Sequence, residues 1–235
     1  MNYISTRNNS KKVSFEHVFL KGLSEDGGLF IPEKLKKLDR KELENLSNLS
    51  YKNLAFNIIK LFTGDFISEL ELKKLVNKSY ENFRDSNVVK INKINKNYLL
   101  ELYHGPTLAF KDIAMQLIGN FYEYYLQRNN KKINIIVATS GDTGAAAINA
   151  IRGKKNINIF VLHPNNKISS VQRKLMTTIE DSNVFNLAID GNFDDCQNLV
   201  KSMFSDKEFS NQINMSGVNS INWARIIAQS VYYFY

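Results

Sequence analysis

The spacing of hydrophobic residues along the chain changes near residue 90. Upstream, apolar residues recur at helical intervals in residues 14–23 and 54–62, and a sharp turn is expected at residues 26–28. Downstream, short apolar stretches alternate with helical patterns. The change predicts a small, mainly helical domain over residues 1–88 and an α/β domain over residues 89–235.

The α/β domain has a regular alternation of elements. Strands are predicted over residues 98–103, 133–139, 157–162 and 184–188, and helices over residues 112–128, 144–152, 169–178, 194–204 and 223–235. Strands separated by helices of this length predict βαβ units and a parallel sheet with right-handed crossovers. Such a sheet binds its ligand beyond the carboxyl ends of its strands. We therefore expect a site at residues 139–144 and 163–167.

The last predicted helix ends on Tyr-Tyr-Phe-Tyr, with no C-cap glycine, polar tail or proline after it. We therefore expect the sequence to be truncated within a longer protein. No later element would then cover the apolar side chains of this helix, which are Ile226, Ile227, Val231, Tyr232 and Phe234. On this interpretation the 235 residues alone are marginally stable and inactive.

Composition narrows the classes of protein. The chain is 43% hydrophobic and 23% charged, as is usual for globular proteins. The single cysteine, Cys196, allows no internal disulfide, which favours a reducing compartment, with the cytosol as the default. No signal sequence is evident, and no apolar run approaches the roughly 20 residues that span a membrane.

Charge and histidine spacing argue against two further classes. The formal charge is +8, but the lysines are scattered among asparagines and form no basic stripe with interleaved aromatics, so nucleic acid is not an expected partner. His17, His104 and His163 lie far apart in sequence, so no metal site is expected. His104 precedes Lys111 by seven positions and is kept as a possible neighbour of a bound cofactor.

Lys111 is the first candidate for chemistry. It follows a Gly-Pro turn and an apolar Leu-Ala-Phe step and directly precedes a long predicted helix. Partial burial and the positive end of a helix both disfavour an ammonium, which is the condition that a nucleophilic lysine needs. The alternative is a solvated surface lysine beside Asp112 at a helix start.

Two further segments have the residues of an anion site. Thr139, Ser140, Asp142 and Thr143 lie with two glycines between a strand and a helix, where hydroxyls and backbone N–H groups converge. Asn219 and Ser220 precede the last helix, and Arg225 lies one turn into it, where arginine can bind a phosphate or carboxylate with two hydrogen bonds. Ordinary helix capping is the alternative for both.

Three motifs, in this order and spacing, resemble the threonine synthases. They are HGPTLAFKD over residues 104–112, ATSGDTGAAA over residues 138–147, and NSIN followed by Arg225. The start of the chain, from STRNNSKKVSFEHVFLKGL to SEDGGLFIPE, also resembles the N-terminal domain of that family. The resemblance implies the tryptophan-synthase-β-like fold of type II pyridoxal-phosphate (PLP) enzymes, with a small N-terminal domain.

The resemblance also implies the chemistry and the role of each residue. The family converts O-phospho-L-homoserine and water into L-threonine and phosphate, the last step of threonine biosynthesis. By resemblance, Lys111 holds PLP, and Asp142 lies beside the cofactor's ring oxygen. The other matching residues bind the substrate, its carboxylate at Thr139, Ser140 and Thr143 and its phosphate at Asn219, Ser220 and Arg225.

One departure from the family keeps alternatives open. The family's glycine-rich loop for the PLP phosphate and the residue facing the pyridine nitrogen would lie beyond the end of this sequence. One alternative is a threonine-synthase-like protein that binds phosphate or PLP without catalysis. The other is a further enzyme of the same fold, such as a serine or threonine dehydratase or a sulfhydrylase, although the N-terminal domain and Arg225 argue against it. Oligomeric state is not predicted.

Overall fold

The computed structural model describes residues 1–235, which form two compact units. Unit 1 combines residues 1–117 with residues 219–235, and unit 2 is the continuous stretch 118–218. The boundary between them falls inside helix α5 (Lys111–Asn129). The change in sequence pattern predicted a domain division at residue 88, which is a different boundary from the one between these two units. The predicted division stays a prediction.

Unit 1 is mainly helical, with two small antiparallel sheets. The helical patterns at residues 14–23 and 54–62 correspond to α1 and α3. The elements are β1 (Tyr3–Ser5), α1 (Phe15–Lys21), β2 (Phe30–Pro32), α2 (Arg40–Ser47), α3 (Tyr51–Thr63), η1 (Gly64–Phe66), α4 (Glu69–Tyr80), β3 (Lys90–Ile94), β4 (Asn97–Glu101), α10 (Trp223–Ser230) and η2 (Val231–Tyr233).

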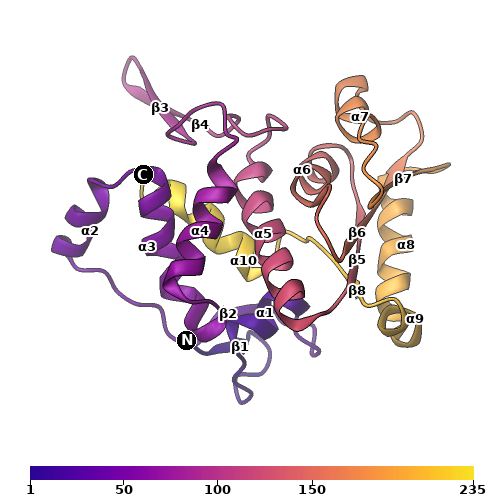
Figure 1. Cartoon of the computed structure of the whole chain (residues 1–235), viewed down its shortest axis with the longest axis horizontal. Coiled ribbons are helices and arrows are strands. Elements are labelled where there is room, and N and C mark those ends of the chain that lie inside the picture. Colours follow the sequence, from indigo (N-terminus) through magenta and orange to yellow (C-terminus); the bar gives the residue numbers. More distant parts are fainter. The chain divides into compact units, whose positions relative to one another are not determined.

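An aromatic core joins the two ends of the chain in unit 1. Tyr3, Phe15 and Phe19 are all buried, and the ring centroids of Phe15 and Phe19 are 6.2 Å apart. Helix α10, yellow in Figure 1, lies beside α1 and α3, which come from the start of the chain. The amide of Asn222 donates a hydrogen bond to the carbonyl of Phe19 (2.7 Å), so residues 203 positions apart are directly linked.

The strand predicted over residues 98–103 belongs to a separate hairpin rather than to the parallel sheet. It is β4, and it pairs antiparallel with β3 from Lys90↔Glu101 to Ile94↔Asn97. Every residue of β3 is exposed. Asn95 makes the tight turn between the strands with φ of 55°, a conformation that asparagine tolerates. This short turn forces neighbouring antiparallel strands, whereas a parallel partner requires a long crossover.

Unit 2 contains a four-stranded parallel sheet in the order β7-β6-β5-β8. Its elements are β5 (Ile133–Ala138), α6 (Asp142–Ile151), β6 (Ile157–Pro164), α7 (Ser170–Thr177), β7 (Val184–Ile189), α8 (Phe193–Ser205), α9 (Lys207–Gln212) and β8 (Met215–Ser216). The predicted α/β architecture with a parallel sheet flanked by helices is therefore confirmed.

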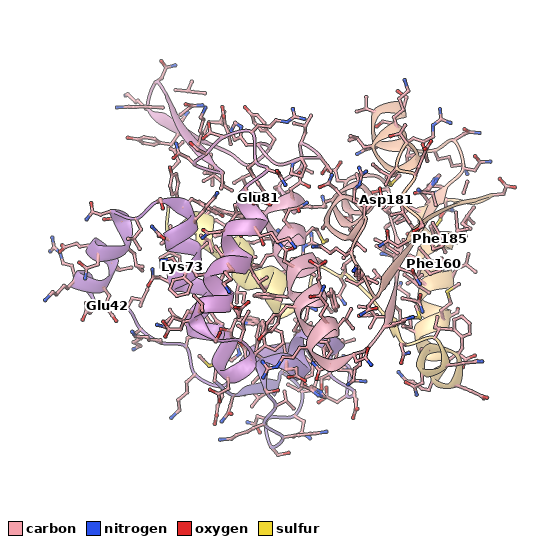
Figure 2. All side chains as sticks on the ribbon, viewed as in Figure 1. Glu42, Lys73, Glu81, Phe160, Asp181 and Phe185 are labelled. Carbon is pink, nitrogen blue, oxygen red and sulfur yellow. The ribbon has the colours of Figure 1, made fainter.

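Helices cover both faces of this sheet. Helix α8 lies on one side of the strands and α6 on the other (Figure 1). Ile136 and Leu162 of the sheet and Cys196 of α8 form a buried cluster between them. On the same face the rings of Phe160 and Phe185 stack with centroids 4.7 Å apart (Figure 2). The two-sided cover explains the nearly continuous apolar sequence of β5 and β6.

None of the helices combines the length and the apolar character that a membrane crossing needs.

Candidate functional site

Lys111 is the first residue of α5, which the sequence pattern placed one residue later. Its side chain is half-buried, and Nζ lies 4.5 Å from the centroid of the Phe110 ring. An ammonium over an aromatic face is attracted by the ring quadrupole. The lysine is therefore held at the N-terminus of a 19-residue helix, as expected from the sequence.

The loop before Lys111 is closed by its own hydrogen bonds. The carboxylate of Asp112 is fully buried and accepts from the backbone N–H of Thr107 (2.8 Å) and from the Thr107 hydroxyl (2.7 Å). A Cβ on Gly105 would lie 2.4 Å from the Cβ of Asp112, so only glycine fits there. Leu108 adopts φ of 62°, in the left-handed region. The backbone that carries Lys111 therefore has one well-defined path.

His104 lies at the start of this loop and pairs with a carboxylate. Its Nε2 is 2.9 Å from Oε2 of Glu101, and both side chains are largely buried. Burial raises the pKa of Glu101, but hydrogen bonds from Tyr103, His104 and Asn92 outweigh that effect and hold the pKa below its ordinary value. Glu101 therefore remains a carboxylate that orients the imidazole.

The second candidate segment is the turn between β5 and α6 in unit 2. Thr139 is buried, and its hydroxyl oxygen accepts from the backbone N–H groups of Gly141 (3.0 Å) and Gly144 (2.9 Å). Gly141 has φ of 143°, and a Cβ there would lie 2.3 Å from Cδ of Gln172. Glycine is therefore required at this position for both its conformation and the close approach.

Side chains from α7 hold the same turn. The amide of Gln172 donates to Oδ1 of Asp142 (2.7 Å), and its oxygen accepts from the hydroxyl of Ser169 (2.9 Å). Helix α6 begins without a side-chain cap at Gly141. Ser140 is exposed and Thr143 half-exposed. Hydroxyls and a positive helix end at one turn are suited to an anion.

The third candidate segment opens α10 in unit 1. Asn222 is the N-cap, and its side chain accepts from the N–H of Ala224 (2.9 Å). Asn219 and Ser220 are exposed just before it. The Asn219 amide lies near Gly22, where a Cβ would come within 3.2 Å of Nδ2. The exposed side chains of Asn219 and Ser220 are therefore accessible to a ligand.

Arg225 is the most unusual charged residue of the three segments. It is 4% exposed, no carboxylate lies within ion-pair distance of its guanidinium, and Nε has no hydrogen-bond partner. Burial lowers the pKa of Arg225, while Tyr232 acts in the opposite direction. A buried cation without a counter-ion is costly unless it is paired. The arrangement therefore favours an anionic ligand at Arg225.

The candidate residues fall into two sets. Lys111 belongs to unit 1 with Asn219, Ser220 and Arg225, and the turn from Thr139 to Gly144 belongs to unit 2. The sequence did not indicate the Thr107–Asp112 bonds, because Asp112 was interpreted as a helix start. No group of three or more His, Cys, Asp or Glu side chains is arranged to hold a metal.

Comparison with known proteins agrees with the three motifs. A family model described as "Threonine synthase N terminus" matches residues 2–80. A threonine synthase of Saccharomyces cerevisiae is 47% identical over 250 residues, which cover 99% of this chain and 48% of the yeast protein. A threonine synthase of Pseudomonas aeruginosa is 46% identical and is matched by 100% of this chain over 50% of its own length.

Solved structures show the same similarity in three dimensions. The PLP-bound threonine synthase from Brucella melitensis superimposes with a TM-score of 0.94 at 46% identity, covering 100% of this chain and 51% of that one. Threonine synthase from Escherichia coli gives a TM-score of 0.87 at 34% identity, with 100% and 53% coverage. The chain spans about half the length of the relatives it matches. The segment that the family model matches lies within this similarity, and the whole chain is similar to the N-terminal part of the threonine synthases.

Proposed function

We propose that the protein is a PLP-dependent threonine synthase that converts O-phospho-L-homoserine and water into L-threonine and phosphate. The support is the identity of 46–47% to threonine synthases over almost the whole chain. A structure with a TM-score of 0.94 belongs to a relative that has PLP bound. The chain spans about half the length of these relatives, so the activity is proposed for the whole protein to which these residues belong.

The residues present fit PLP. Covalent attachment needs a primary amine that is held near a fixed backbone, and Lys111 meets that requirement at the start of α5. When bound, PLP withdraws electrons from the substrate's carbon atoms and so allows protons and the phosphate to leave. Asp142, oriented by Gln172, would lie beside the cofactor's ring oxygen.

The chain's own residues would then divide the remaining work. Lys111 would hold the cofactor and afterwards move protons at the substrate's carbon atoms. Ser140 and Thr143 offer hydroxyls for the substrate carboxylate. The oxygen of Thr139 already accepts two backbone N–H groups, so Thr139 can serve the carboxylate only by donating its hydroxyl proton.

The observation that carries the choice of substrate is Arg225. The burial of a guanidinium with no ionic partner is explained if a bound dianion neutralises it. A phosphate can do so through two parallel hydrogen bonds. Asn219 and Ser220, which lie just before α10, would supply further donors. Free serine or threonine, the substrate of a dehydratase, carries no phosphate and so offers no dianion to Arg225.

The experiment is to incubate the purified protein with PLP and O-phospho-L-homoserine and to measure phosphate release and threonine together. Equal amounts of both products support the proposal. Conversion of free serine or threonine to a keto acid would instead indicate a dehydratase. Tight binding of PLP or phosphate with no product would indicate a non-catalytic relative.

We also propose a cytosolic location. The support is the single cysteine, which is buried on α8 and has no thiol partner, as suits a reducing compartment. Fractionation of cells that express the protein tests this, and recovery with an oxidising or membrane compartment would contradict it.

A further inference from the structure

The buried carboxylate of Asp112 is unusual among the helix-start carboxylates of this chain. Asp39 and Asp206 cap α2 and α9 from exposed positions. Asp112, at the second position of α5, is 0% exposed. A buried carboxylate is unfavourable unless it is well hydrogen-bonded, and capping can be achieved from the surface. Its burial therefore calls for an explanation beyond helix stability.

The hydrogen bonds of Asp112 point back into the loop. One oxygen accepts from the Thr107 backbone N–H and the other from the Thr107 hydroxyl, across five positions of sequence. Both donors belong to Thr107, so these two bonds act on the loop before Lys111. Asp112 therefore fixes the backbone on one side of Lys111 to the loop on the other.

Two features show that the loop is held tightly. At Gly105 a Cβ would lie 2.5 Å from Oδ2 of Asp112, so the backbone passes the carboxylate at the closest distance that glycine permits. Leu108 is held at φ of 62°, a conformation that a non-glycine residue keeps only where its surroundings enforce it. Its N–H donates to the carbonyl of Gly105 (3.2 Å).

We propose that Asp112 is a positioning residue, which with Thr107 locks residues 105–112 and so fixes the point from which Lys111 reaches its cofactor. The inference rests on the proposed function. Under that function Lys111 must both attach the cofactor and move protons, so its side chain must change partners while its Cα stays in place. A displacement of about 1 Å in such a group can lower a rate about 100-fold.

The test compares Thr107→Val with Thr107→Ser in the full protein. Valine keeps the branched shape but removes the hydroxyl that donates to Asp112, and serine restores it. The matched control is Ser79→Ala, which removes another buried hydroxyl of unit 1, one that donates to the carbonyl of Leu75 (2.7 Å). Asp112→Asn is a fourth variant, which removes the charge and keeps the shape.

The first measurement is the rate at which added PLP becomes attached to Lys111, trapped by borohydride and located by mass spectrometry. We expect Thr107→Val to slow attachment and to lower kcat by about 10- to 100-fold, with KM within about threefold of the parent. Thr107→Ser should restore both rates. Ser79→Ala should lower the melting temperature and leave the attachment rate unchanged.

Attachment and kcat in Thr107→Val at the parental rates would overturn the proposal, and so would an equal loss in Ser79→Ala. The Thr107 pair decides the matter even if Asp112→Asn fails to fold. Attachment is measured without substrate, so a parent protein that takes up PLP but forms no threonine refutes the proposed function alone.

Discussion

Two cations of unit 1 differ in their surroundings. Lys111 is half-buried with its ammonium over the Phe110 ring, whereas Arg225 is almost fully buried and has no ionic partner. A lysine can lose its proton and react with a carbonyl, and an arginine cannot. The first residue is therefore suited to covalent attachment and the second to holding an anion.

Replacing Arg225 with methionine should separate stability from activity. The variant removes a buried charge that lacks a counter-ion, so we expect the ligand-free protein to be as stable or more stable, by about 1–4 kcal/mol. Loss of a charge-assisted phosphate contact should lower kcat/KM for phosphohomoserine by about 30- to 1000-fold, which corresponds to about 2–4 kcal/mol. Thermal melting and steady-state kinetics measure the two effects.

The control for Arg225 is Arg40→Met, on a residue whose side chain is 93% exposed. Inorganic phosphate should raise the melting temperature of the parent and of the control, but not of Arg225→Met. Phosphohomoserine turnover within about threefold of the parent in Arg225→Met would contradict the phosphate role.

Lys111→Ala should abolish both the visible absorbance of lysine-bound PLP and threonine formation. Lys111→Arg should do the same, since a guanidinium stays protonated. Lys131→Ala is the matched control, because Lys131 also holds its ammonium near an aromatic ring, 5.6 Å from the centroid of Tyr125. A borohydride-reducible PLP adduct that persists in Lys111→Ala would show that another lysine carries the cofactor.

For single residues, the sequence predicted the identity of the candidates well and their structural surroundings less well. The position of Lys111 at a helix start was predictable from the Gly-Pro turn before it. The burial of Arg225 was not, because an arginine one turn into a helix is usually solvated and its cover comes from residues distant in sequence. The partner of His104, three residues earlier on β4, was missed for lack of a predicted hairpin.

At the scale of elements, the α/β alternation was predictable because each strand is a short apolar run between helical patterns. The ends of β5, α7 and β7 lie within one residue of prediction. β3 was missed because Lys-Ile-Asn-Lys-Ile is polar at three of five positions and exposed throughout. β8 has only two residues, too few for a periodic signal. Tertiary pairing, not local pattern, decides both strands.

The link between the β3–β4 hairpin and the loop before Lys111 should be sensitive to acid. The pKa of Glu101 is lower in the folded protein than its ordinary value of 4.5. The contribution of Glu101 to the free energy of unfolding is therefore complete above pH 4.5 and is lost as the pH falls through the pKa of the folded state. We expect the melting temperature of the parent to fall more steeply below pH 4.5 than that of Glu101→Gln.

Glu44→Gln is the control for Glu101, because Glu44 forms an exposed ion pair with Arg40 on α2. Its melting temperature should follow the parent over the whole acid range. Parallel curves for the parent and Glu101→Gln would show that the carboxylate does not stabilise this link.

At the scale of the whole molecule, Cys196 provides a reporter of unfolding. It is 0% exposed in the core cluster between α8 and the sheet, and burial raises the pKa of its thiol. The thiolate is the reactive form, so a thiol reagent at neutral pH should label the native protein far more slowly than the protein in denaturant. The labelling rate should follow the opening of unit 2. Immediate labelling of the native protein would contradict this burial.

Unit 1 is built from two segments that are far apart in sequence, and this affects how it folds during synthesis on the ribosome. Unit 2 is continuous, so its sheet can form once residue 218 has left the exit tunnel. Unit 1 must wait for α10, because Asn222 and Phe19 are joined across 203 positions. At translation speeds of about 5–20 residues per second, the segment before Lys111 is made many seconds before α10 can dock against it. Unit 2 can therefore complete its fold before unit 1, although its synthesis starts later. Until α10 is made, the helices of residues 1–117 must stay soluble by themselves or with the help of chaperones.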